Sequence, residues 1–304
     1  MITVVGSLNM DLLIETRRLP APGETVHGHD FRHAPGGKGA NQACGVARMG
    51  MKCAMIGAVG DDAFGEELLS SLRADGVDVA AVMRRAKNST GVAMITVDAA
   101  GQNQIVIASG ANETVAPQDV ARHGAVFRTA KAVIVQLEIP LPAVEAALRC
   151  ARKERALAVL NPAPCVTLAD SLLRLCDWII PNGIEAGQLC GMTVSNTSEA
   201  AVAAKRLRER SDGARVAVTL GEAGVWLETP DFTGHVPGFT VRSIDSVAAG
   251  DTFIGAFITR LVEGADPRDA ARFACAAAAI SVTRRGAQAS IPLRSEVEAW
   301  LRNR

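Results

Sequence analysis

The sequence predicts an α/β protein in which a central, mostly parallel sheet is flanked by helices, with a small β-sheet lid. Short apolar, β-branched runs alternate with longer alanine-rich segments of helical period, and this alternation is typical of a parallel sheet covered on both faces. In two regions, paired strand-like segments with no helix between them interrupt this alternation. The 304 residues suffice for one large core, so we expect a single domain over residues 1–304.

The elements of the central sheet follow from these runs in chain order. Strands are expected at residues 2–5, 53–58, 133–136, 156–160, 178–181 and 216–220. Helices are expected at residues 40–49, 64–75, 141–154, 198–209, 249–263 and 267–284. Gly50, Gly76 and Gly264 follow three of these helices, where glycine commonly ends a helix. Ser198, followed by Glu199, indicates the start of the fourth helix.

The lid is predicted from short strands at residues 12–16, 25–31, 91–97 and 104–108. Residues 98–103 join the last two strands as a hairpin turn, so the second lid segment covers residues 91–108. We expect both segments to leave the core and return to it at the same end of the main sheet. A projecting sheet of this kind can close over a site as a lid.

Charge and cysteine usage limit the possible partners. The chain has 32 Lys and Arg against 32 Asp and Glu, so no overall field favours a nucleic-acid or membrane partner, and we expect neither. The seven cysteines are scattered without C-x-x-C spacing, which indicates reduced thiols and a cytoplasmic protein. The G-x-G-x-x-G fingerprint is absent, which disfavours a nicotinamide-dependent oxidoreductase.

The strongest chemical signal lies in residues 245–253, which pass from an extended stretch through small residues into a long apolar helix. A helix start near Ala249 exposes consecutive backbone amides, and Gly250 allows close approach, so this segment can bind a phosphoryl group. Asp251 lies beside these amides and can accept a proton from an attacking hydroxyl. The alternative is that Asp251 only favours the helix dipole.

A second signal is the glycine-rich segment at residues 34–42, directly before a helix. Gly36, Gly37 and Gly39 surround Lys38 and allow a small polar ligand to approach the backbone. The G-x-x-x-x-G-K-[ST] spacing of a Walker loop is absent. The alternative is a purely structural turn.

Further polar residues are expected where strands end, which is where open α/β sheets bind ligands. Asn9 and Asp11, assigned to the end of the first strand, would share a face, and Glu138 follows the third strand. Asn182 and Glu185 can hold magnesium-bound waters and phosphate, or form an ordinary helix cap. Residues 219–224 form a glycine turn on which a nucleotide phosphate can rest, or a plain β-turn.

From Gly6 to Ser290 the sequence resembles the ribokinase-type members of the PfkB carbohydrate kinases, and residues 36–43 and 245–257 look like the two family signatures. The resemblance implies a ribokinase-like fold and ATP-dependent, in-line phosphorylation of D-ribose at O5 to ribose 5-phosphate. It also implies Mg²⁺ and K⁺ as cofactors and a homodimer formed through the lid, whose sheet would otherwise have unpaired edges.

The resemblance also implies a role for each matching residue. Asp251 would be the catalytic base, beside an anion hole made by the amides of Ala248, Ala249 and Gly250. The sugar would be bound by Asn9, Asp11, Gly37, Lys38, Gly39, Asn41, Glu138 and Asp251. The nucleotide would be bound by Asn182, Glu185, Thr219, Leu220, Gly221, Glu222, Ala223, Gly224, Gly250 and Cys275. The K⁺ loop would comprise Asp245, Val247, Ser281, Arg284, Gly286 and Ser290.

Other readings remain open. A related kinase could act on 2-deoxyribose, another sugar or a nucleoside, although Asn9 favours a ligand with a full set of hydroxyls. A non-enzymatic sugar sensor would keep the fold, but the retained Asp251 argues against it. Gly183 stands where a Glu often follows the Asn in similar proteins, and Cys275 where a His is common, so the details of the ATP contacts are open.

Overall fold

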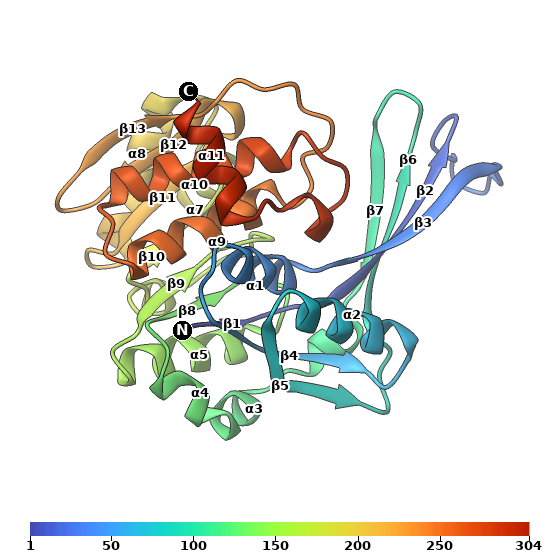
Figure 1. Cartoon of the computed structure of the whole chain (residues 1–304), viewed down its shortest axis with the longest axis horizontal. Coiled ribbons are helices and arrows are strands. Elements are labelled where there is room, and N and C mark those ends of the chain that lie inside the picture. The colour runs from blue at the N-terminus through green and yellow to red at the C-terminus, as the bar shows by residue number, and fades with distance from the viewer. Residues whose placement is uncertain (304) are drawn as a thin grey trace.

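The computed structural model describes residues 1–303, in which a nine-stranded sheet forms the centre of the molecule (Figure 1). Its strands are ordered β13 (Thr233–Pro237), β12 (Gly224–Glu228), β11 (Arg215–Thr219), β10 (Trp178–Ile179), β9 (Leu157–Leu160), β8 (Ala132–Val135), β1 (Ile2–Val5), β4 (Cys53–Gly60) and β5 (Val77–Arg85). The seven strands from β5 to β11 are parallel, whereas β12 and β13 are antiparallel. The chain adds strands on both sides of β1, so a topological switch point lies beside it.

Helices cover both faces of this sheet because successive side chains of its buried strands point to opposite faces. Ile2 and Val4 pack in one core cluster, whereas Val133 and Val135 pack in the other. The first face is covered by α1 (Lys38–Arg48), α2 (Ala63–Ala74), α9 (Ala249–Val262), α10 (Pro267–Ser281) and α11 (Arg294–Arg302). The second is covered by α3 (Pro117–Arg122), α4 (Gly124–Arg128), α5 (Leu141–Lys153) and α6 (Asp170–Leu173). Beside β11, α7 (Gly183–Cys190) and α8 (Thr197–Arg210) form a third cluster.

Two contacts fix the position of α9, whose first turn carries Asp251. Phe257 meets Trp178 of β10 edge-on, with ring centroids 4.9 Å apart, an arrangement that contributes about 0.5–1.5 kcal/mol beyond area burial. On the neighbouring side, Gly255 packs against Gly45 of α1, where a Cβ at 255 would lie only 2.9 Å from the Gly45 carbonyl carbon. The backbones of α1 and α9 are therefore in direct contact.

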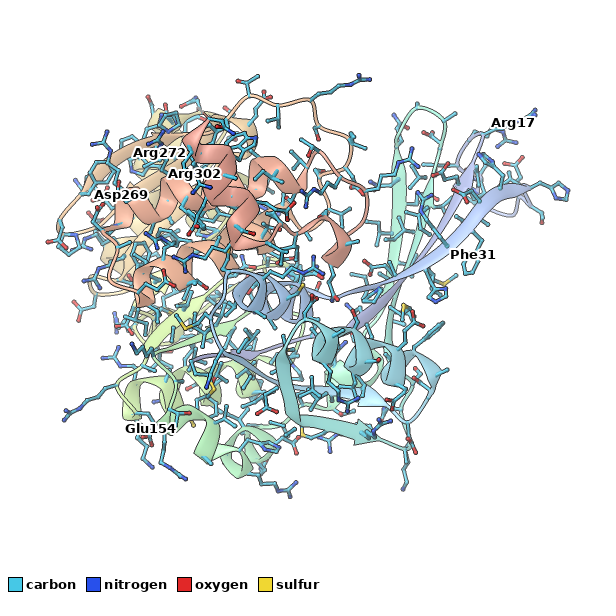
Figure 2. The ribbon with its side chains drawn as sticks, viewed as in Figure 1. Arg17, Phe31, Glu154, Asp269, Arg272 and Arg302 are labelled. Atoms are coloured by element: carbon cyan, nitrogen blue, oxygen red, sulfur yellow. The ribbon has the colours of Figure 1, made fainter. Side chains whose placement is uncertain are left out.

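The second sheet projects from the main body (Figure 1) and contains β3 (Gly28–Gly36), β2 (Asn9–Thr16), β6 (Gly91–Val97) and β7 (Asn103–Ala108) in that order. Residues 98–102 close the β6–β7 hairpin, with the Asp98 amide donating to the Gln102 carbonyl. Figure 2 shows Phe31 on this projecting sheet and Arg17 at its tip, just after β2. Every residue of β7 is exposed.

Most predicted elements are confirmed, with shifted boundaries. The six predicted strands and six predicted helices each overlap an observed one, and Gly50, Gly76 and Gly264 all have positive φ. The sequence does not reveal β5, β12, β13, α3, α4, α6 and α11, and for α7 it indicates only a possible start at Asn182. The helix predicted to end at Arg284 ends at Ser281, and Asn196 caps α8 instead of Ser198, because its side chain accepts from the Glu199 amide.

The position assigned to Asn9 and Asp11 was also wrong. They do not end the first strand but begin β2, because β1 stops at Val5 and the chain turns into the lid at residues 6–8. The predicted lid strand at residues 25–31 is β3, shifted to Gly28–Gly36. Both β2 and β3 are longer than predicted, and each has one end at the main body, at Asn9 and Gly36. No helix in residues 1–303 is long and apolar enough to cross a membrane.

Candidate active site

The candidate site lies at the carboxyl ends of the parallel strands. Ser7 follows β1, Glu138 follows β8, Asn161 follows β9 and Asn182 follows β10. Because parallel strands end at one edge of a sheet, these polar residues from distant parts of the sequence meet beside the switch point. The start of α9 faces the same region.

The first turn of α9 exposes its backbone amides at this edge. Ala248 caps the helix in the left-handed conformation, at φ 60°, an uncommon conformation for a residue other than glycine. The Ala249 amide donates to the Ser246 carbonyl over 3.3 Å, beyond the usual range for a strong bond. Ala248, Ala249, Gly250 and Asp251 all line one cavity of about 200 Å³.

The Asp251 carboxylate is held by two amide side chains of α1. Asn41 Nδ2 donates to Oδ2 over 3.0 Å, and Gln42 Nε2 donates to Oδ1 over 2.9 Å. Asp251 is only 7% exposed, yet it lines the cavity. Its position is therefore set by residues near the start of the chain.

The predicted glycine-rich segment brackets the start of α1. Gly37 has φ 89°, and a Cβ there would lie 2.7 Å from the Asn9 amide nitrogen, so glycine is required on both counts. The turn aims the Lys38 amide at Glu138, with a distance of 3.1 Å to Oε2. Ser7 donates to the same oxygen over 2.5 Å and accepts from the Gly39 amide over 3.2 Å.

Asn9 and Asp11 join this group from β2. Asn112, in the 3₁₀ helix Gly110–Thr114, donates to Asn9 Oδ1 over 2.7 Å and also binds both backbone groups of Leu8. The Asp11 carboxylate lies against the Cα of Gly36. Burial, and then the charges of Glu138 and Asp251, raise the pKa of Asp11 to about 7.

Lys38 is the cation at the centre of these carboxylates and lines the cavity. Burial acts to lower its pKa, but the charges of Asp251, Glu138 and Glu185 together raise it, so the ammonium form is kept. The predicted sugar-binding residues are thus gathered around one cation and several carboxylates, which suit a ligand rich in hydroxyl groups.

A second cavity, of about 380 Å³, adjoins the first. It lies between the glycine turn after β11, the segment at residues 238–246 and helices α9 and α10. The two cavities share four lining residues: Thr219, Ser246, Ala249 and Gly250. The larger cavity therefore meets the smaller one at the first turn of α9.

The residues predicted to bind nucleotide divide between this cavity and its surroundings. Its lining includes Thr219, Gly221, Glu222, Gly224, Gly250 and Cys275. Leu220 instead turns its side chain toward Gly183, and the Ala223 carbonyl accepts from the Gly238 amide. Burial raises the pKa of the Cys275 thiol to about 12, so this thiol is a neutral wall of the cavity.

Asn182 and Glu185 form the helix cap that the sequence left as one alternative. Asn182 Oδ1 accepts from the Glu185 amide, and Glu185 Oε2 accepts from the Asn182 amide, each over 2.8 Å. Both also line the smaller cavity, and burial raises the pKa of Glu185. Capping does not remove them from the site, since an ionised carboxylate has further lone pairs.

The six residues predicted for the cation loop come from two segments that the structure joins. Asp245 accepts from the Gly286 amide over 2.9 Å and from the Val247 amide over 3.0 Å, and its own amide donates to the Val282 carbonyl. Ser281 and Ser290 are buried, and each donates to a carbonyl within its own segment. The Arg284 side chain instead pairs with Glu296 over 2.5 Å.

The sequence does not identify the buried polar residues that hydrogen-bond to the predicted site residues. Ser7, Gln42, Asn112, Gln136 and Asn161 are buried polar residues that touch the predicted site residues or each other. Gln42 and Gln136 are polar residues within or beside buried apolar elements, and this was the available signal, but only the folded chain reveals their partners.

Comparison with known proteins identifies the family of this chain. The model of the pfkB family carbohydrate kinases matches residues 1–294. The chain belongs to this family. As a pfkB family carbohydrate kinase it is a phosphotransferase, and the predicted resemblance is confirmed.

Relatives of this carbohydrate kinase match along almost its whole length. A ribokinase of Haemophilus influenzae is 41% identical over 300 residues, covering 99% of this chain and 98% of that protein. A deoxyribokinase of Salmonella typhi is 36% identical over 301 residues, with 99% and 98% covered. The structure of Arabidopsis thaliana ribokinase complexed with ribose and ATP has a TM-score of 0.90 and 30% identity, covering 99% of this chain and 98% of that one. The predicted ribokinase-like fold is confirmed.

Proposed function

We propose that this kinase transfers the γ-phosphoryl group of ATP to O5 of D-ribose. The observation that carries the proposal is the meeting of two cavities at the first turn of α9, where Asp251 lies among polar side chains and the larger cavity has an apolar wall. ATP would occupy the larger cavity, and the sugar would lie beside Lys38 and Asp251, the two predicted sugar-binding residues that line the smaller cavity. The ribokinase relatives and the Arabidopsis complex support the choice of ribose.

In the proposed reaction, O5 of ribose attacks the γ-phosphorus while the bond to the ADP oxygen breaks in line with it. Asp251 accepts the O5 proton as the new O–P bond forms, and the amides of Ala248, Ala249 and Gly250 bind the phosphoryl oxygens. Lys38, Asn41 and Glu138 would orient the sugar, together with Asn9, Asp11, Gly37 and Gly39. Leaving any of the sugar hydroxyls unpaired would cost about 1–3 kcal/mol each.

The cation sites belong to the proposal. Mg²⁺ would be held through water by Asn182 and Glu185, whose oxygen donors line the same cavity as Asp251. Within residues 1–303, no group of three or more His, Cys, Asp or Glu is arranged to hold a metal, so phosphate oxygens would supply the remaining ligands. When bound, Mg²⁺ neutralises charge on the phosphates.

K⁺ would be held by oxygens of two hydrogen-bonded segments, residues 245–247 before α9 and residues 281–290 at and after the end of α10. Asp245 already links these segments, as described above, and hard carbonyl and carboxylate oxygens suit this cation. Because the loop leads directly into α9, the ion would act by ordering the anion hole.

We further propose that the chain is one domain, acts in the cytoplasm and forms a homodimer through the lid. Val106 is 68% exposed and Phe31 64%, and Met94, Ile105 and Ile107 on the same small sheet are also exposed. An exposed apolar sheet of this kind favours burial against a second copy. The seven cysteines are all free thiols, which suits a reducing compartment.

An ADP-release assay with ribose, 2-deoxyribose, fructose and nucleosides, with and without K⁺, tests the proposal. We expect the highest kcat/KM with ribose, Mg²⁺ and K⁺ present. The Salmonella relative makes 2-deoxyribose the second candidate. A higher kcat/KM with 2-deoxyribose or with a nucleoside would replace the proposed substrate. An equal kcat/KM with and without K⁺ would contradict the proposed K⁺ site.

A further inference from the structure

We infer that Gln42 is a positioning residue that fixes the carboxylate of Asp251 for proton transfer. This rests on the proposed function, in which Asp251 accepts the proton of the sugar hydroxyl. Gln42 lies in α1, has no exposed surface, and donates to Asp251 Oδ1 over 2.9 Å. Since it is fully buried, it touches no ligand and acts on the reaction through the side chains that it contacts, of which Asp251 is the reacting one.

The orientation of the Gln42 amide follows from groups that can only accept. The Ile180 carbonyl accepts from Asn161 Nδ2 over 2.9 Å, so Asn161 must turn its Oδ1 toward Gln42. An ionised Asp251 also only accepts. Gln42 must therefore present Nε2 to both, at 3.0 Å from Asn161 and 2.9 Å from Asp251.

Gln136 closes this arrangement from the other side. With its Nε2 committed, Gln42 turns its Oε1 toward Gln136, which donates over 2.6 Å. Gln136 is itself fully buried, directly after β8, and its own Oε1 lies against Gly6 with no hydrogen-bond partner among the described residues. Every hydrogen of Gln42 Nε2 and one lone pair of its Oε1 are thus used, which leaves the amide no second orientation of equal energy.

This fixed amide restrains the Asp251 carboxylate. The terminal torsion of an aspartate is intrinsically broad, so an unsupported carboxylate would rotate. Here Gln42 holds Oδ1 and Asn41 holds Oδ2, and the two bonds define the carboxylate plane. Asp251 still lines the cavity, so a lone pair remains for the sugar hydroxyl.

A purely structural role is the competing explanation, because any buried glutamine needs partners. The two explanations differ in what replacement does to the reaction. Gln42→Met keeps the length of the side chain but cannot donate. Gln42→Glu places a carboxyl group within hydrogen-bond distance of Asp251, and two carboxyls at such spacing share a proton and titrate as a pair.

The test measures kcat and KM for ribose and ATP from about pH 5.5 to about pH 9 in the full chain, since the pH profile of kcat reports groups in the bound complex. We expect Gln42→Met to lower kcat by about 10²-fold, the loss typical of a misplaced reacting group, with both KM values changed by less than about 3-fold. Gln42→Glu should add an ionisation to the kcat profile that neither the wild type nor Gln42→Met has. Thr3→Val, which removes a buried hydroxyl without a partner on β1, serves as the control and should keep wild-type kcat.

Two further variants keep the inference testable. Gln136→Met leaves Gln42 in place but frees its Oε1, so kcat should fall below the wild-type value, by less than in Gln42→Met. If Gln42→Met does not fold, wild-type kcat in Gln136→Met overturns the inference. Wild-type kcat in Gln42→Met, or a Gln42→Glu profile parallel to the wild type, would overturn the inference. If Asp251→Asn is inactive while Gln42→Met is fully active, only the positioning role fails; if Asp251→Asn turns over normally, the proposed base fails first.

Discussion

Gly255 of α9 packs directly on Gly45 of α1, with no room for a Cβ at 255. A Cβ at 255 would lie 2.9 Å from both the Gly45 carbonyl carbon and the Val46 amide nitrogen. This contact holds the start of α1, with Asn41, next to the start of α9, with Asp251. The packing of α1 against α9 therefore also sets the position of the Asp251 carboxylate relative to Asn41.

Gly255→Ala should separate the two helices. Overpacking of this kind costs about 1–3 kcal/mol, partly offset by the gain of about 1 kcal/mol in helix propensity. We expect a lower free energy of unfolding in urea and a reduced kcat. Gly124→Ala is the matched control, because nothing lies within 4 Å of a Cβ there. Equal stability and turnover for both variants would contradict the close contact.

The raised pKa of Asp11 gives a pH dependence of stability. Its pKa is about 7 in the folded protein against 3.8 ordinarily, so the folded state binds this proton more tightly than the unfolded state. The charged form therefore destabilises the fold increasingly as the pH rises from about 4 to about 7, by on the order of 1.4 kcal/mol per pKa unit. Below that window Asp11 contributes no penalty.

Asp11→Asn removes this penalty. The stability difference between Asp11→Asn and the wild type, measured by chemical unfolding, should grow in favour of the variant between about pH 4 and about pH 7 and then level off. Asp231→Asn, which replaces an exposed carboxylate, serves as the matched control for the loss of one charge. A stability difference for Asp11→Asn that does not change with pH would contradict the raised pKa of Asp11.

Asn112 is expected to act on sugar binding alone. It fixes the Asn9 amide and both backbone groups of Leu8, so Asn112→Leu should raise KM for ribose by about 10-fold or more, equivalent to the loss of one or two buried hydrogen bonds. KM for ATP should stay unchanged. Asn196→Ala, which removes the cap of α8, should cost about 1 kcal/mol of stability without changing KM for ribose. A defect confined to ATP would contradict this assignment.

The predicted homodimer through the lid is tested by placing a charge on the exposed apolar face of the lid. Val106→Glu places a carboxylate on the most exposed large apolar residue of β7, so the variant should sediment as a monomer while the wild type sediments as a dimer. Val202→Glu, at a 45% exposed position on α8, should stay dimeric. A monomeric wild type, or a dimeric Val106→Glu variant, would place the interface elsewhere or remove it.

The sequence predicts the interior of this fold better than its edges. Continuous apolar runs such as β1 and β8 are buried on both faces and were found, whereas β5 carries Asp78 and Arg84 at exposed positions and was missed. The edge strand β13, its neighbour β12 and the short helices α3, α4 and α6 also give weak periodic signals. Asn9 and Asp11 were assigned to the wrong strand because the chain leaves β1 without a marked turn sequence.

For the site, the sequence predicts residues that belong to recognisable motifs and misses residues defined only by contact. Asp251 and Lys38 stand in such motifs. Gln42 lies beside Asn41 in the same motif, but its partner Asp251 is 209 residues away, and Asn112 is 104 residues from Leu8. No local pattern carries such distances, so the supporting amides appear only once the chain is folded.

The central claim is that Asp251 accepts the sugar proton where the two cavities meet. Asp251→Asn keeps the size of the side chain and removes the base, so its kcat for ribose should fall by at least about 10²-fold, the lower end of a general base's contribution, while calorimetry still detects ribose and ATP binding. Unchanged turnover in Asp251→Asn, with both ligands bound, would contradict the account.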